Sequence, residues 1–385
     1  MNTKTIKSLN FIIERDSKDT TYKFALLRSV IETVQYFDHL KKEENNKVIF
    51  PLGLLIEKWI LYYYPLIEND IPQKHGENKS HLSKTLAFKA DLEKLVNYYK
   101  DKGGISVFYS DYKNGNLPEE IKYLFLELVK KLKSTITDMP MKYLGKSYYQ
   151  KEYSIFNFNK DSNRIRKNDI EKIKIDRGFL IKNFGTFSFP KELYIVFIYF
   201  GSFLNGTESI IYKWAEFSAK LDESRDLNVE KVLESLLISP ENERDVELSK
   251  RIYKELIKKN GKIECVWSEK PVTDKTLNVD HVLPFSIWQN NDLWNLLPAH
   301  KEVNQKKKDK IPSPELIKVR SGLITYYWKI VHSICKDRFE KEIYTGLIGL
   351  DKNLKGKNLF DIGIKSLSDK AIYLIDVRGY EPWNP

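Results

Sequence analysis

Apolar residues recur at three- and four-residue steps through the first part of the chain, the spacing typical of amphipathic helices. The first stripe follows Thr20 and Thr21, which can cap a helix, and consists of Phe24, Leu27, Ile31 and Val34. A second helix is predicted over residues 52–66. A third begins at Pro118, and its stripe consists of Ile121, Leu124, Phe125, Leu128, Val129 and Leu132. These stripes predict a helical N-terminal domain over residues 1–140 that packs around an apolar core. They give no information about chemistry.

The pattern changes over residues 141–260, where aromatic and basic side chains alternate before helical spacing returns. The aromatic residues are Tyr148, Tyr149, Tyr153, Phe156 and Phe158, and a basic run follows at residues 164–167. Such a mixture can bind a nucleic-acid backbone and stack bases; it equally suits short strands with one solvated face, which we favour slightly. Helices are then predicted over residues 190–204, 207–221, 228–238 and 243–259, and Asn260-Gly261 ends the last one. We interpret residues 141–260 as a mixed and then helical middle region that could bind DNA or a partner.

Composition sets wide limits on the class of protein. The 385 residues suffice for two or three domains, and the net charge of +11 favours a polyanionic partner such as DNA. Two cysteines without a Cys-x-x-Cys motif argue against a disulfide scaffold, and no structural zinc is expected. The longest apolar run, residues 193–204, is too short to span a bilayer, and the first residues lack the apolar core of a signal peptide. We therefore expect a cytoplasmic protein without a membrane partner.

Residues 261–313 carry a different pattern, two short apolar segments followed by a lysine-rich helix. Strands are predicted over residues 263–267 and 277–282, around a turn that contains Pro271 and Asp274. Residues 296–297 suit another short strand, and Pro298 is predicted to open a helix that carries Asn304. The segment is thus predicted to form a β-hairpin followed by a helix.

This segment concentrates the residue types that phosphodiester hydrolysis needs. A histidine such as His281 can take a proton from water near neutral pH. Mg²⁺ prefers oxygen ligands, which Asp280 and Asn304 can offer. Asn295 can form a hydrogen bond near the histidine and orient it, and Lys307, one helical turn beyond Asn304, can reach a phosphate. Adjacent strand residues face opposite sides, so the strand must end or twist for Asp280 and His281 to share a site.

The order and spacing of these residues resemble the HNH, or His-Me finger, nucleases. The segment Val279-Asp280-His281-Val282-Leu283-Pro284 is similar to their Asp-His strand; Asn295 matches the middle Asn, and Asn304 the last position. The spacings of fourteen and nine residues, the closing Lys-x-Asp-x-x-Pro-Ser pattern of residues 307–313 and the lead-in Cys265-Val-Trp-Ser-x-Lys270 resemble the HNH module of CRISPR effector nucleases. A glycine is common where Glu269 stands, and the zinc-binding cysteine pairs of many HNH proteins are absent.

The resemblance implies roles for these residues. His281 would be the general base, Asp280 and Asn304 would bind Mg²⁺, for which Mn²⁺ substitutes, and Asn295 would position the histidine. DNA would be cut to give 5′-phosphate and 3′-hydroxyl ends. Glu302 stands at an acidic position of the motif and could assist the metal. Lys306, Lys307 and Lys310 are predicted to contact nucleic acid, with a solvated helix face as the alternative, and His300 is placed at the surface or on DNA.

The chain as a whole is loosely similar to stand-alone bacterial HNH proteins with long helical N-terminal regions, which implies a role in restriction or phage defence, as a homodimer or with a partner protein. We expect a predominantly helical α+β protein, with an HNH (ββα-metal) finger at 261–313 and a helical cap at 314–385. Two alternatives stay open. The enzyme could act on RNA or on a DNA structure, or the finger could be a relic in a nucleic-acid-binding protein, with His281 an ordinary core histidine.

Overall fold

The computed structural model describes residues 9, 19–75, 85–144, 155–159, 170, 173–205, 210–222, 226–240, 245–349 and 358–385. Contacts within the chain divide it into two units, Met1–Pro240 and Glu241–Pro385. Helices dominate both units and the sheets are small, so the predicted α+β class is confirmed. None of the helices in the described ranges is both long enough and apolar enough to cross a membrane.

The first unit is built around a buried helix, α3 (Gly53–Glu68), which carries the fully buried Trp59, Tyr63 and Tyr64. A Cβ at Gly53 would lie 2.3 Å from the carbonyl carbon of Leu180, so this glycine lets the backbone of α3 approach the backbone of α9 (Arg177–Asn183) closely. The other described helices of the unit are α2 (Tyr22–Tyr36), α4 (Lys89–Lys100), α5 (Gly104–Asn114), α6 (Glu119–Asp138), α7 (Pro140–Tyr143), α9 (Arg177–Asn183), α10 (Lys191–Asn205), α11 (Ile210–Leu221) and α12 (Val229–Leu237).

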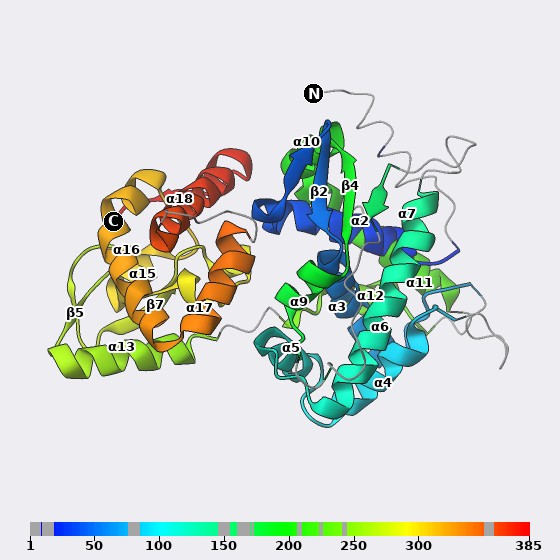
Figure 1. Ribbon diagram of the computed structural model, residues 1–385, viewed down its shortest axis with the longest axis horizontal. Helices are drawn as coiled ribbons and strands as arrows, with labels where there is room; N and C mark the ends of the chain where they lie inside the picture. The colour runs from blue at the N-terminus through cyan, green and yellow to red at the C-terminus, as the bar shows by residue number, and fades with distance from the viewer. Residues whose placement is uncertain are drawn as a thin grey trace. The chain divides into compact units, whose positions relative to one another are not determined.

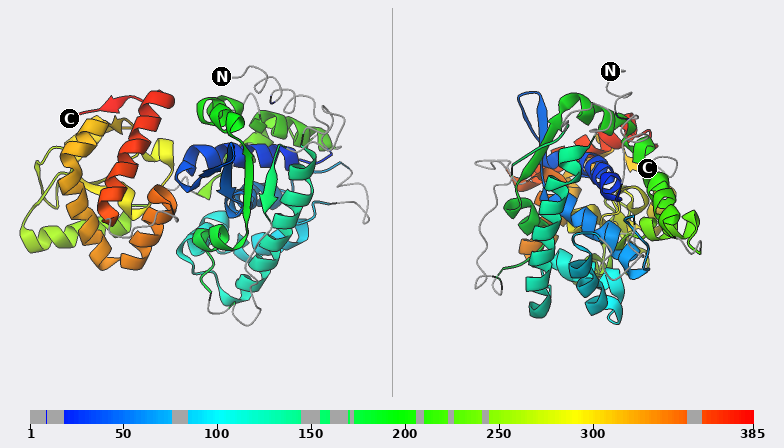
Figure 2. Two further views of the ribbon diagram at one scale, coloured as in Figure 1. Left: turned by 45° about the horizontal axis from the view of Figure 1, so that its top comes forward. Right: turned by 90° about the vertical axis from the view of Figure 1, so that its right-hand side faces the viewer.

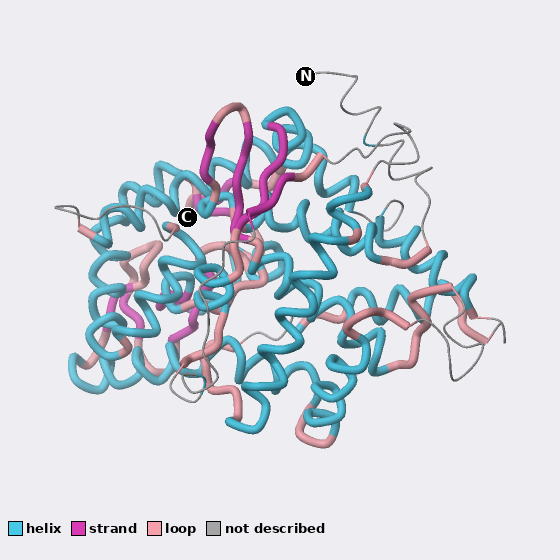
Figure 3. Tube along the Cα trace, turned by 45° about the vertical axis from the view of Figure 1, so that its right-hand side comes forward, coloured by secondary structure: helices cyan, strands magenta, loops and turns pink. Residues whose placement is uncertain are grey.

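A four-stranded antiparallel sheet joins distant parts of this unit in the order β1-β2-β4-β3. Its strands are β1 (Lys42–Glu44), β2 (Lys47–Pro51), β3 (Asn157–Asn159) and β4 (Thr186–Pro190), drawn in magenta in Figure 3. The β1–β2 turn places Asn45 and Asn46 at positive φ, which asparagine tolerates well. Helix α10 packs on β2, β4 and α2 (Figures 1 and 2).

Two groups of charges are held inside the first unit. The Arg177 guanidinium makes a bidentate ion pair with Glu57 on α3. The Glu32 carboxylate lies 3.0 Å from Arg28 Nε and 2.6 Å from Lys58 Nζ. Burial raises the pKa of Glu32, but Lys58 and Arg28 outweigh that effect and lower it to about 2. These pairs lock α2, α3 and α9 together, and the ion pairs satisfy charges that would be costly to bury alone.

The second unit surrounds a two-stranded antiparallel sheet formed by β7 (Leu277–His281) and β8 (Leu296–His300). Helix α16 (Pro314–Ile334) packs against α18 (Leu359–Ile372), as Figure 1 shows. The remaining elements are α13 (Glu247–Asn260), β5 (Ile263–Glu264), β6 (Pro271–Val272), α14 (Phe285–Trp288), α15 (Lys301–Lys307), β9 (Ile311–Pro312), α17 (Lys336–Ile343) and β10 (Pro382–Trp383). Short π-helical turns extend α17 and α18.

The structure groups the predicted regions differently from the sequence. Strands β3 and β4, from the predicted middle region, complete the sheet begun by β2, so residues 141–240 belong with the first unit. Helix α13 belongs with the second unit. Phe156, directly before β3, is buried against Phe187 and Phe189, so this side chain packs in the core and is not open to stack on a base. Tyr148, Tyr149, Tyr153 and residues 164–167 lie outside the described residues.

Candidate active site

The candidate site lies at the end of strand β7. The β7–β8 ladder pairs Asp280 with Leu297 and His281 with Leu296, and β7 ends at His281. The predicted hairpin partners are different here, because residues 263–264 pair with 271–272 and residues 277–281 pair with 296–300. Strand β8 continues through Pro298 to His300, so the helix begins at Lys301 rather than at Pro298. A two-stranded sheet followed by α15 is the arrangement that the HNH resemblance implies.

Asp280 is buried and held by two donors. Its Oδ2 accepts a hydrogen bond of 2.7 Å from Trp267 Nε1, and its Oδ1 accepts one of 3.1 Å from Lys307 Nζ. Asp280 is 3% exposed and Lys307 is 0% exposed. Two charge-assisted partners inside the protein fix the orientation of the carboxylate, which a metal ligand needs.

Lys307 lies in the interior, in contrast to the prediction that it contacts nucleic acid. Its ammonium donates to the His281 carbonyl at 2.6 Å as well as to Asp280. Val303 and Lys307 are four residues apart and form the buried face of α15, so this lysine points toward β7 whereas its neighbours in the charge run face solvent. Lys307 therefore holds Asp280 and the His281 backbone in place from the interior, and its ammonium is not available at the surface.

His281 has a separate set of contacts. Its Nε2 lies 3.0 Å from Asn291 Oδ1, and its ring packs 5.2 Å from the Phe285 ring, measured between centroids. The residue is only 1% exposed. Asn291 Oδ1 also accepts a hydrogen bond of 3.2 Å from the backbone N–H of Asp245. Asn291 thus occupies the orienting position beside the histidine that the sequence assigned to Asn295.

Asn295 acts on the backbone of the loop instead. Its Oδ1 accepts a hydrogen bond of 2.8 Å from Leu283 N, and its Nδ2 donates to the carbonyls of Leu283 and Asn290, both at 3.1 Å. The side chain is fully buried. Asn295 therefore closes the loop between β7 and β8, and holds His281 through the main chain two residues away.

The other predicted site residues lie on or beside α15. Asn304 is partly exposed, one turn before Lys307. His300 caps the helix, since its Nδ1 accepts from Glu302 N at 3.3 Å, and Glu302 itself is exposed. Lys306 is exposed, while Lys310 pairs with Glu381. Asn304 therefore lies on the same helix as Lys307, partly open to solvent, and Lys306 is at the surface.

Glu269 occupies the position where a glycine is common in the motif, and its backbone explains that preference. Its φ is +58°, in the left-handed region that favours glycine. The Glu269 carboxylate pairs with Arg320 on α16. A glycine would adopt this backbone conformation without strain, whereas Glu269 adds an ion pair at this position.

Residues far outside the motif support the finger. Trp383 packs its ring at 87° to the Trp267 ring, and β10 pairs in parallel with β9. Tyr253 donates to the Leu296 carbonyl at 2.8 Å, and Trp328 Nε1 donates to the Trp294 carbonyl at 2.8 Å. Trp267 stands in the Cys265-Val-Trp-Ser lead-in, so its importance could have been inferred from the sequence. Asn291 and Trp383 carry no comparable signal.

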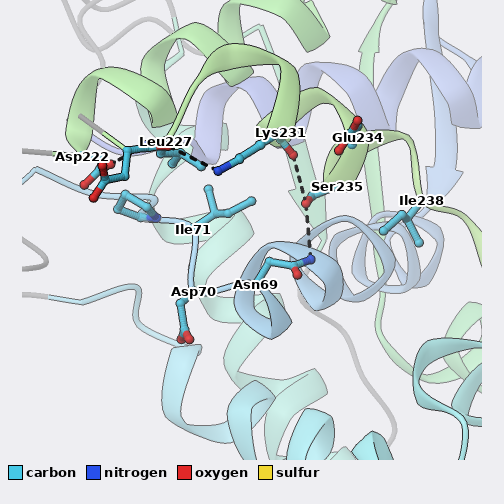
Figure 4. Close-up of a pocket in the computed structure, with 11 residues that line it drawn as sticks. Asn69, Asp70, Ile71, Asp222, Leu227, Lys231, Glu234, Ser235 and Ile238 are labelled. Carbon is cyan, nitrogen blue, oxygen red and sulfur yellow. Dashed lines mark hydrogen bonds between the residues drawn. The ribbon is translucent and has the colours of Figure 1, made fainter. Parts of the chain in front are cut away.

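A separate pocket in the first unit has a volume of about 560 Å³. Its walls come from residues 69–72, just after α3, from residues between α11 and α12, and from helix α12 (Figure 4). The charged side chains that line it are Asp70, Asp222, Asp226, Glu234 and Lys231. Four carboxylates against one ammonium disfavour a phosphate group, so this pocket does not suit a nucleic-acid backbone.

Comparison with known families divides the chain in the same way. Residues 2–236, more than half of the chain, match a family described as a domain of unknown function (DUF8808). The chain belongs to the DUF8808 family. Residues 265–313 of this DUF8808 protein match a second family, described as HNH endonuclease. No curated protein and no solved structure matches the chain.

The HNH match confirms the predicted finger near the C-terminus and supports nuclease activity in general. It begins at Cys265 and ends at Ser313, so it includes Asp280, His281, Asn295 and Asn304. In the DUF8808 protein, the HNH segment lies within the second unit, whereas the DUF8808 match ends four residues before Pro240, the last residue of the first.

Proposed function

We propose that this DUF8808 protein is a metal-dependent endonuclease that hydrolyses DNA phosphodiester bonds with its HNH domain. One observation carries the proposal: within the HNH endonuclease match, Asp280 and His281 close strand β7 directly against α15. The net charge of +11 and the exposed Lys306 favour a polyanionic substrate.

In this proposal His281 takes the proton of the attacking water. Asn291 and the backbone loop closed by Asn295 hold the imidazole in place, so little reorganisation is needed during the reaction. Lys307 contacts the His281 carbonyl and so links the base to the carboxylate beside it. Asn291, Asn295 and Lys307 thus position the base, and His281 alone transfers the proton.

The donor set fits a hard divalent cation such as Mg²⁺ or Mn²⁺. Asp280 and Asn304 would hold it through a carboxylate and an amide oxygen, and waters would complete its shell. Bound there, the ion would stabilise negative charge on the phosphoryl group and the leaving oxygen. The described residues hold no group of three or more His, Cys, Asp or Glu suited to a metal, so the proposed set relies on one carboxylate. With the cation bound, the Lys307 ammonium would either keep one oxygen of Asp280 or lose its contact with this carboxylate.

Burial of His281 makes a second candidate worth testing. At 1% exposure the imidazole is covered, and the side chains over it, among them Phe285, must move aside before a phosphodiester can reach it. A nucleic-acid-binding protein with a non-catalytic finger would need no such movement. Cleavage by the purified protein separates the two candidates.

The test is cleavage of supercoiled plasmid, linear DNA, branched DNA and RNA by the full chain with Mg²⁺ or Mn²⁺, followed by end mapping. We expect DNA cleavage with 5′-phosphate and 3′-hydroxyl ends, which is lost in His281→Ala. His332→Ala is the matched control, because His332 lies in the same unit and pairs with Glu340 rather than with a residue of the HNH match. Thermal unfolding of both variants checks that they fold. If His281→Ala is folded and cleaves as the wild type does, the proposed mechanism is wrong.

A role in restriction or phage defence, as a homodimer or with a partner protein, extends the proposal. It is supported only by the similarity of the whole chain to stand-alone bacterial HNH proteins. One finger cuts one strand at a time, so two-strand cleavage would require two copies or two successive nicks. The ratio of nicked to linear plasmid over time distinguishes these cases.

A further inference from the structure

The orientation of His281 depends on a residue outside the motif positions assigned above. Asn291 lies in the loop between α14 and β8, and its Oδ1 is 3.0 Å from His281 Nε2. The same oxygen is 3.2 Å from the backbone N of Asp245, just before α13. The two contacts together decide which atom of the Asn291 amide faces the imidazole.

The Asp245 contact fixes the amide orientation because a backbone N–H can only donate. The Asn291 atom that it meets must therefore be the carbonyl oxygen and not the NH₂ group. An oxygen can only accept, so His281 Nε2 must carry a proton in order to face it. In the neutral ring the proton is then on Nε2, and Nδ1 holds the lone pair.

We propose that Asn291 is the positioning residue that sets the tautomer of His281 and makes Nδ1 the basic atom. The inference rests on the proposed nuclease function for its consequence. In the reaction, the Nδ1 lone pair takes a proton from water while the water oxygen bonds to phosphorus. The P–O3′ bond breaks, and the 3′ oxygen leaves with a proton from solvent.

The loop that carries Asn291 is anchored firmly enough for this task. Asn290 Oδ1 accepts from Asp292 N at 2.7 Å, and Asn290 Nδ2 donates to Asp292 Oδ2 at 2.7 Å. Glu342 on α17 accepts from Leu293 N at 2.7 Å. Anchors on both sides of Asn291 hold its amide in one place, which is how a supporting hydrogen bond fixes a histidine tautomer.

The first experiment is ¹⁵N NMR of the full chain labelled at histidine, with His281→Ala used to assign the ring signals. In mildly alkaline solution, where imidazole is neutral, we expect Nε2 of His281 to give the signal of a protonated nitrogen and Nδ1 that of an unprotonated one. In Asn291→Ala this preference is expected to disappear. Asn291→Asp, which keeps an oxygen for both donors, is expected to retain it. Gln289→Ala is the control, since Gln289 is exposed in the same loop.

The second experiment measures cleavage by the same variants. We expect Asn291→Ala to lower kcat about 10- to 100-fold, the usual effect of losing an outer hydrogen bond to a catalytic group, with KM changed by less than about threefold. Asn291→Asp should recover most of the rate. A wild-type His281 protonated on Nδ1, or an unchanged tautomer and kcat in Asn291→Ala, overturns the inference. Normal cleavage by His281→Ala would instead overturn the proposed function, while the NMR result would still decide the tautomer.

Discussion

The buried ion pair between Asp280 and Lys307 offers a direct test of how the finger is held. Lys307→Met removes the ammonium and keeps a side chain of similar length. Asp280 would then keep the hydrogen bond from Trp267 but lose the contacts of 3.1 Å to Oδ1 and 3.0 Å to Oδ2. A carboxylate that is 3% exposed would be left without its counter-charge.

The expected loss is about 3–5 kcal/mol in the free energy of unfolding, the usual result when one partner of a buried pair is removed. Adding Asp280→Asn should restore part of the loss, because a neutral amide needs no counter-charge. We expect the double variant to be about 2 kcal/mol more stable than Lys307→Met alone. Lys306→Met, the exposed neighbour on α15, should change stability by less than about 0.5 kcal/mol.

Urea unfolding followed by tryptophan fluorescence measures these differences. Five of the seven tryptophans lie in the second unit, and Trp267 contacts Asp280 directly. A loss of less than about 1 kcal/mol in Lys307→Met would show that the ion pair does not hold the site as the distances suggest. A double variant no more stable than Lys307→Met would refute the assignment of the loss to an unpaired carboxylate.

Two further predictions concern backbone strain and pH. Glu269→Gly should be about 1 kcal/mol more stable than Glu269→Ala in urea unfolding, because both variants lose the pair with Arg320 but only glycine relieves the φ of +58°; equal stabilities would argue against strain. The pKa of Glu32 is lowered from 4.5 to about 2 in the folded chain, so its contribution of about 3 kcal/mol is present above pH 4.5 and lost as pH falls toward 2. When the free energy of unfolding of the full chain is measured at falling pH, Glu32→Gln should lose less stability than the wild type. Identical curves would contradict the assignment of this loss to Glu32.

Local pattern was enough to locate most helices of the first unit. The stripes predicted helices over 52–66 and 228–238, and the structure has α3 at Gly53–Glu68 and α12 at Val229–Leu237. Strand partners could not be obtained in this way. Strand β2 pairs with β4, more than 130 residues later, because Phe50, Phe187 and Phe189 stack on one another in the core. Such pairing depends on long-range packing and leaves no mark in either segment alone.

At the site, the sequence predicted which residues take part more accurately than it predicted which atoms they contact. The ordered spacing selected Asp280, His281, Asn295 and Asn304, all within the HNH match. It could not tell which amide faces the imidazole, because Asn291 and Asn295 stand in one loop with similar chemistry. The lysine run also looked uniform, yet Lys307 alone among its lysines follows Val303 by four residues onto the buried face. Which face of α15 is buried depends on its packing against β7 and β8, and this packing cannot be read from the lysine run alone.

The contacts also explain how a finger lacking the zinc-binding cysteine pairs of many HNH proteins keeps its shape. A ββα segment of about 50 residues buries little apolar surface by itself, and small units of this kind usually need additional support. Here the support comes from outside residues 265–313: Tyr253 fixes β8, Trp328 fixes the turn before it, Glu342 holds the loop, and Trp383 packs on the tryptophan that holds Asp280. The stable element is therefore the whole unit Glu241–Pro385, and the geometry of Asp280 and His281 is a property of that unit rather than of the motif.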